Sequence, residues 1–74
     1  MTQQDALDLV RRLLKAADDE ELMRLVADNL GAVDGVFFST AEAAAQQLER
    51  EGKAPIASAL RGLTDRMLRM KTLI

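Results

Sequence analysis

The sequence contains no cysteine and no histidine among its 74 residues. Without cysteine the chain forms no disulfide and offers no thiolate, and without histidine it lacks the commonest metal ligand and general base. These absences exclude metal–thiolate, Cys-His and Ser-His-Asp sites. We therefore expect no metal site, no cofactor and no enzymatic activity.

Aromatic residues, glycine and proline are also scarce, with two phenylalanines, four glycines and one proline. The four glycines are scattered and form no phosphate-binding loop. Apolar residues nevertheless make up 49% of the chain, so the core must come from leucine, valine, methionine and alanine, which favours helix over sheet. A chain of this length forms a single domain, residues 1–74, and buries only about 60% of the surface that it exposes when unfolded.

Long apolar runs and a strong excess of one charge are absent. No apolar run approaches the ~20 residues that span a bilayer, and no charged start followed by an apolar core resembles a signal peptide. We therefore expect a cytoplasmic protein with no membrane partner. The net charge is −2, and neither half of the chain is basic enough to predict binding to nucleic acid.

Two helices are predicted in the N-terminal half, at residues 3–17 and 19–30. Thr2 is typical of a residue that caps the start of a helix. Asp18 caps the second helix, and Glu21 stands where a capping-box carboxylate belongs. The apolar face of the first helix is broad enough to contact two other helices.

The start of the third helix, which ends at about residue 51, has two interpretations. A cap at Ser39, with Glu42 three residues later, gives a shorter helix. A cap at Asp34 gives a helix over residues 35–51 and brings Phe37 onto its apolar face. We favour the Asp34 start because it buries a large apolar side chain.

A fourth helix is predicted at residues 55–72. Gly52 tolerates the left-handed conformation that ends helices, and Pro55 suits a first helical turn. A connection this short makes the third and fourth helices antiparallel neighbours. Gly62 lies in the middle of the fourth helix with small residues one turn earlier, which indicates a close helix crossing.

The chain is therefore predicted to be all-α, a small four-helix bundle of antiparallel helices with short loops. Its apolar positions recur at helical spacing on one face of each helix. The predicted core comprises Leu7, Val10, Leu14, Leu22, Val26, Leu30, Phe37, Ala41, Ala44, Leu48, Ile56, Leu60, Leu63 and Met67.

The final helix carries several basic residues with Asp65 as its only acid. Three interpretations stay open: a solvated face that also complements the helix dipole, a surface for an acidic protein, and, least favoured, a nucleic-acid or membrane contact. The chain also has more apolar side chains near this helix than one small bundle can cover. Together they form a candidate interaction surface: Phe38, Arg61, Arg66, Arg69, Met70, Leu73 and Ile74.

From Ala17 onward the chain resembles a small helical module of bacterial, chiefly cyanobacterial, multidomain proteins, where it precedes tetratricopeptide repeats or CHAT domains. The resemblance rests on DDEEL at residues 18–22, VDGV at 33–36, AAQQLEREG at 44–52 and ALRGL at 59–63. It implies an all-helical cap or adaptor with no active site. The chain departs from the pattern at the Phe37–Phe38 pair and at residues 53–55. The resemblance assigns a role to no individual residue.

The sequence thus predicts a non-enzymatic protein–protein interaction, capping or adaptor module whose partner is another, unidentified protein. The alternative is a self-associating structural protein, a homodimer. One amphipathic face serves a neighbouring helix or a second chain equally well. An enzyme would instead need a cleft with converging acidic groups.

Overall fold

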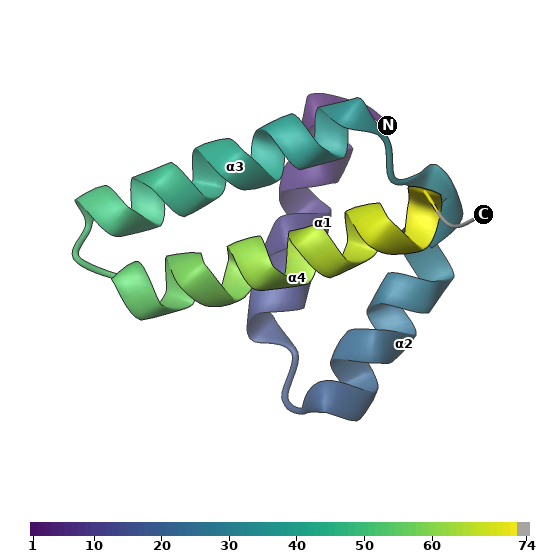
Figure 1. Cartoon of the computed structure of the whole chain (residues 1–74), viewed down its shortest axis with the longest axis horizontal. Coiled ribbons are helices and arrows are strands. Elements are labelled where there is room, and N and C mark those ends of the chain that lie inside the picture. Colours follow the sequence, from purple (N-terminus) through teal and green to yellow (C-terminus); the bar gives the residue numbers. More distant parts are fainter. Residues whose placement is uncertain (73–74) are drawn as a thin grey trace.

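The computed structural model describes residues 1–72, which form four α-helices and one short 3₁₀ turn (Figure 1). The predicted all-α, four-helix bundle is confirmed, and each helix begins and ends within two residues of its predicted bounds. Leu73 and Ile74, two members of the predicted interaction surface, lie outside the described residues. In chain order the elements are α1 (Gln3–Lys15), α2 (Asp19–Asn29), η1 (Leu30–Ala32), α3 (Gly35–Arg50) and α4 (Ala54–Thr72).

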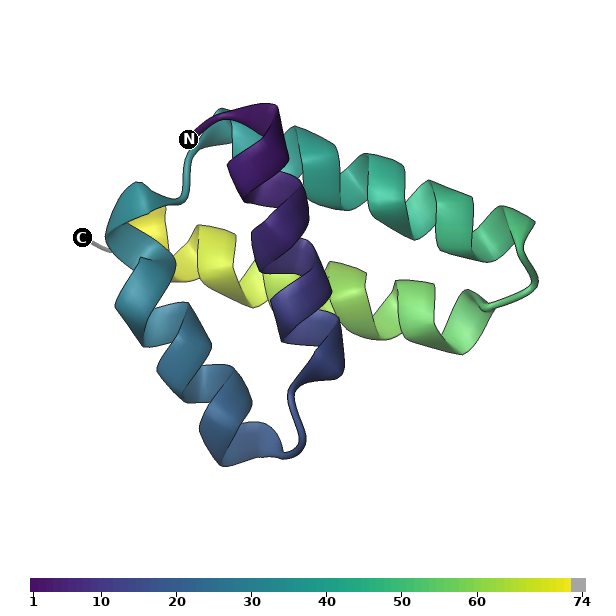
Figure 2. The ribbon, with the colours of Figure 1, turned by 180° about the vertical axis from the view of Figure 1, so that it is seen from behind.

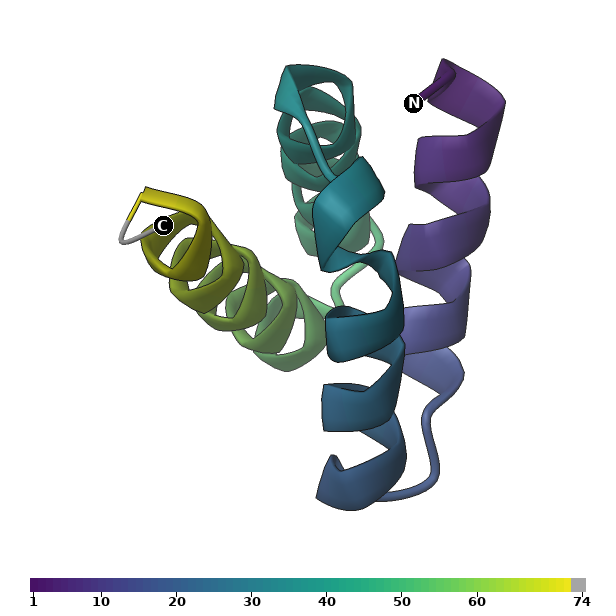
Figure 3. The same cartoon turned by 90° about the vertical axis from the view of Figure 1, so that its right-hand side faces the viewer.

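The helices α3 and α4 form an antiparallel hairpin, as predicted (Figure 1). The helix α1 lies across one face of this hairpin, and α2 returns from the far end of α1 to the start of α3 (Figures 2 and 3). The most extensive contact between helices joins α3 to α4, and the next joins α1 to α3. The hairpin and α1 therefore form the body of the domain, with α2 at its side.

Side-chain caps fix the starts of α1, α2 and α3. The hydroxyl of Thr2 accepts a hydrogen bond from the amide of Asp5, and the carboxylate of Asp18 accepts one from the amide of Glu21. At α3 the carboxylate of Asp34 accepts from the amide of Phe37 at 3.2 Å. The Asp34 start is therefore confirmed, and a helix start at the alternative cap is wrong.

The turn between α3 and α4 is a Schellman motif centred on Gly52, whose φ is +79°. The amide of Lys53 donates to the carbonyl of Leu48, and the amide of Gly52 donates to the carbonyl of Glu49. This pattern satisfies the last carbonyls of α3 and reverses the chain. Pro55 then occupies the first turn of α4, where its missing amide hydrogen removes no helical bond.

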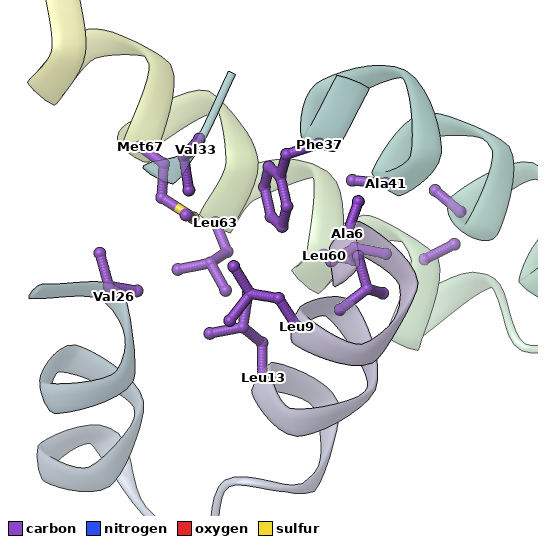
Figure 4. Packing of buried hydrophobic residues seen from close by; sticks show 13 residues of the cluster. Ala6, Leu9, Leu13, Val26, Val33, Phe37, Ala41, Leu60, Leu63 and Met67 are labelled. Atoms are coloured by element: carbon purple, nitrogen blue, oxygen red, sulfur yellow. The ribbon is translucent and has the colours of Figure 1, made fainter. Parts of the chain in front are cut away.

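The core lies where α1 meets the α3–α4 hairpin. Phe37 is fully buried there, and leucines from α1 and α4 lie around it (Figure 4). The hairpin contributes small side chains as well as large ones, so the helices approach closely. The buried residues are Ala6, Leu9, Val10, Leu13, Val26, Val33, Phe37, Ala41, Ala45, Ala57, Leu60, Leu63 and Met67.

Part of the predicted core is not buried. Leu14 and Ile56 keep 41% and 44% of their surface exposed, so their prediction as core residues is wrong. In α1 the buried face is shifted by one residue from the predicted one. In α4 the buried residue is Ala57 and not its neighbour Ile56, because the small side chain of alanine permits closer packing. The remaining predicted core residues that are only half-buried are Leu7, Leu22, Leu30, Ala44 and Leu48.

The prediction of a close helix crossing at Gly62 is also wrong. Gly62 is exposed, and a Cβ atom built there meets no other atom within 4 Å. Its small neighbours Ser58 and Ala59 are exposed as well. This strip of α4 faces away from the core.

Candidate functional site

The predicted interaction surface on α4 contains Arg61, whose guanidinium is held by two carboxylates of α3. It donates to both carboxylate oxygens of Glu42, at 3.3 and 3.1 Å, and forms an ion pair with Glu49. The hydrogen bond from Arg61, aided by its charge, lowers the pKa of the Glu42 carboxyl. Arg61 therefore joins the two helices of the hairpin.

The other basic residues of α4 differ in their partners. Arg69 forms an ion pair with Asp65 of the same helix at 2.9 Å. The ammonium of Lys71 donates to the carbonyls of Leu30 and Val33, and so caps the end of the segment that follows α2. Among residues 1–72, Arg66 is exposed and has no ion-pair partner. Three of the four basic residues of α4 therefore have partners within the chain: Arg61, Arg69 and Lys71.

Among the described residues, the apolar members of the predicted surface are Phe38 and Met70. The antiparallel hairpin brings the end of α4 to the start of α3 (Figure 1). Met70 belongs to the last turn of α4 and Phe38 to the first turn of α3. Both side chains are half-buried against the core. The ring of Phe38 meets that of Phe37 edge to face, with 5.5 Å between their centroids. The core therefore covers part of the apolar area that suggested this surface.

Another apolar surface lies elsewhere, between α1 and α3. A hollow of about 720 Å³ lies between the two helices. One wall is formed by Leu7 and Leu14 of α1, and the other by Ala43, Ala44 and Leu48 of α3. The small alanine side chains leave the hollow open on the α3 side, and the leucines border it on the α1 side.

A second apolar hollow, of about 330 Å³, adjoins the first at Leu14, which lines both. Its wall includes Leu22 at the start of α2 and Ile56 at the start of α4. We call the two hollows together the Leu14 surface. It comprises Leu7, Leu14, Leu22, Ala43, Ala44, Leu48, Ile56 and Ala59.

The edges of the Leu14 surface are polar. On the α1 side, Arg11 lines the larger hollow and lies 3.9 Å from Asp8, a long ion pair, while Lys15 one turn later has no ion-pair partner among residues 1–72. On the α3 side, the amide of Gln47 donates to the carboxylate of Glu51 at 3.0 Å. This bond, with the charge of a neighbouring lysine, lowers the pKa of Glu51. Both edges thus carry charges of both signs, because Asp8 pairs with Arg11 and Lys53 pairs with Glu51 at 3.5 Å.

Sequence reasoning placed the members of the Leu14 surface in the core or left them out. The signal that could have found it is the width of the apolar face of α1, which includes Ala6, Leu9 and Leu13 as well as Leu7 and Leu14. The prediction that this face contacts two helices is confirmed, since α1 packs against α2 and α3. Those contacts cover only part of it.

The described residues bury no charged or polar side chain. Within residues 1–72, no group of three or more acidic side chains is arranged to hold a metal ion. No helix in that range has the length and apolar character needed to cross a membrane. What the Leu14 surface can do chemically is bury apolar area against a second surface.

Comparisons with protein-family models, with curated proteins and with solved structures find no match to this chain. The resemblance noted from Ala17 onward therefore stays a prediction. The Leu14 surface is the feature of the described residues from which a function can be argued.

Proposed function

We propose that this protein is a non-enzymatic interaction domain, a cap or adaptor, whose Leu14 surface docks an apolar helix face of a partner protein. The observation that carries the proposal is the exposure of Leu14 and Ile56, 41% and 44%, beside two hollows, of which the smaller is lined by apolar residues and the larger by apolar and polar ones. Apolar area removed from water contributes about 25 cal/mol per Å². A partner that covers these side chains gains that contribution.

The fold itself supports a helix as the docking element. On its inner face α3 presents Ala41 and Ala45, which are buried in the same cluster as Leu60 of α4 and Ala6 of α1 (Figure 4). On its outer face the same helix presents Ala43 and Ala44 to the larger hollow. A helix with leucines on one face would fill the outer face as neighbouring helices fill the inner one.

The resemblance to helical modules that precede tetratricopeptide repeats also supports a cap or adaptor role. A bacterial source and a cytoplasmic location belong to the same proposal. The interaction surface predicted on α4 is a weaker candidate, because Arg61 and Arg69 already have partners within the chain.

Site-specific photo-cross-linking tests the proposal. A photoreactive amino acid replaces Ala43, which is exposed and lines the larger hollow, in the cells that make the protein. The control position is Leu68, which is 47% exposed on α4 and lines neither hollow of the Leu14 surface. We expect position 43 to form a cross-link to one defined protein, identified by mass spectrometry, and we expect L14E to abolish it.

Two results would contradict the proposal. Position 43 could form no protein cross-link, or positions 43 and 68 could give the same products in equal yield. In the second case the Leu14 surface would be no more engaged than an unrelated exposed site.

A further inference from the structure

We propose that residues 17–33, which we call the α2 segment, form a strap that opens as a unit from the rest of the domain, and that Lys71 of α4 is its latch. The segment comprises α2 and the 3₁₀ turn η1. Its consequence for the Leu14 surface rests on the proposed function, whereas the opening itself does not.

The hydrogen bonds of the α2 segment begin and end at its own boundaries. At its start the amide of Ala17 donates to the carboxylate of Glu21, while the amide of Ala16 donates back into α1. At its end the amide of Val33 donates to carbonyls within the segment, while Asp34 caps α3. In the described part of the chain, no hydrogen bond or ion pair joins the segment to α1 or α3. The chain can therefore bend at both boundaries without the loss of such a bond.

Lys71 supplies the hydrogen bonds that tie the α2 segment to the rest of the domain. Its ammonium donates to the carbonyl of Leu30 at 3.1 Å and to that of Val33 at 2.5 Å. Among residues 1–72 these are the hydrogen bonds that link the segment to another helix. Bonds from a charged donor are stronger than neutral ones, so this single side chain provides the polar attachment of the segment.

The apolar attachment of the α2 segment is also small. Only Val26 and Val33 are buried in it, and α2 itself buries one of its 11 residues, whereas α1 buries four of its 13. The last turn of α2 contains Asp28 and no basic residue, which is unfavourable at the negative end of a helix. Regions with few buried apolar contacts open at a lower free energy than the core. We therefore expect α2 to be the first helix to open.

Opening of the strap would change the smaller hollow of the Leu14 surface. Leu22 of α2 lines that hollow together with Leu13 and Leu63, which are both buried core residues. When α2 moves away, the hollow loses its Leu22 wall and these two leucines become accessible. The strap thus controls how much apolar area the Leu14 surface offers to a partner.

Native-state hydrogen exchange of the full chain, followed by NMR, tests the inference. An isolated helix shorter than about 12 residues is marginal in water, so α2 melts once detached and its amide hydrogens exchange. We expect amides in the second half of α2 to be at least about tenfold less protected than those in the middle of α3 and α4. A low concentration of denaturant should change the α2 rates little, because a local opening exposes little surface.

Three variants separate local opening of α2 from unfolding of the whole domain. G52A strains the turn between α3 and α4, so it should lower the protection of these two helices and leave that of α2 unchanged. K71M removes the latch ammonium but keeps an aliphatic side chain, and should speed α2 exchange about tenfold. The control R69M removes a cation of the same helix whose partner is Asp65, and should leave α2 exchange unchanged.

Three results would overturn the inference. The amides of α2 could be as well protected as those of α3, their protection could fall in G52A by the same factor as that of α3, or K71M could leave α2 exchange at the wild-type rate. None of these measurements involves a partner. An α2 that opens in a chain whose position 43 forms no cross-link would refute the docking role and leave the strap standing, and the reverse combination would refute the strap alone.

Discussion

The inner and outer faces of α3 both carry alanines, but the alanines of the two faces differ in how far the rest of the chain covers them. Ala41 and Ala45 on the inner face are 1% and 0% exposed, whereas Ala43 and Ala44 on the outer face line an open hollow. Both faces lie on one helix and have leucines opposite them. The difference lies in whether other helices are in place, which suggests that α3 offers two docking faces and that the chain itself fills one.

Truncation of one leucine beside each face of α3 should show the difference between the covered and the open face most clearly. Leu60 is 1% exposed beside the inner face, and Leu14 is 41% exposed beside the outer one. We expect L60A to lower the free energy of unfolding by about 2 to 5 kcal/mol through lost burial and a cavity. L14A should cost less than about 1 kcal/mol in the monomer. Urea unfolding of dilute protein measures both, and equal losses would contradict the distinction.

Enlargement of an alanine on each face tests whether space is available there. Ala45 is fully buried, so A45L should overpack the core and cost about 1 to 3 kcal/mol. Ala43 borders the larger hollow, so A43L should change stability by no more than about 0.5 kcal/mol. Thermal melts of the two variants give the comparison. A large loss in A43L would show that the outer face is closed.

Substitution of two glycines of the hairpin should change the stability of the domain by smaller amounts and in opposite directions. Gly52 has a left-handed φ of +79° in the turn that allows α4 to cover the inner face, so G52A should destabilise the domain by about 1 to 2 kcal/mol. Gly62 lies in α4 with nothing near its Cβ position, so G62A should stabilise it by about 0.5 to 1 kcal/mol. Denaturant unfolding would contradict this account if both changes had the same sign.

The smallest expected effect is that of acid on the exposed ion pair between α3 and α4. The hydrogen bond from Arg61 lowers the pKa of Glu42, which joins α3 to α4. The folded state therefore binds fewer protons than the unfolded state, and this part of the stability is lost as the pH falls below about 4.

We expect the melting temperature to fall in that range and E42Q to show a shallower fall. Because the carboxylate is exposed, added salt should reduce the difference between the two proteins. A steeper acid response in E42Q than in the wild type would refute this assignment.

Local sequence signals predicted the helices well. Asp34 in front of the phenylalanine pair, and Gly52 followed by Pro55, are short-range signals whose capping hydrogen bonds involve only nearby residues. They set the start of α3 and the antiparallel hairpin. For this reason four helices and their order could be derived without knowledge of any contact between them.

The rotation of each helix could not be derived in the same way. In α1 the apolar residues spread over so wide a face that the 7, 10, 14 stripe and the buried 6, 9, 10, 13 stripe are both consistent with the sequence. In α4, Ile56 is the more apolar choice, but Ala57 fits the narrow space inside the core. Contacts between helices decide such cases, and the same uncertainty hid the Leu14 surface.

The central claim is that the outer face of α3 is open in this chain, whereas its inner face is covered by the rest of the fold. Methyl NMR with a soluble paramagnetic agent on dilute protein tests it most directly. We predict that the Leu14 methyls are strongly relaxed, while the Leu60 methyls stay shielded. Leu14 methyls as shielded as those of Leu60 would contradict the claim.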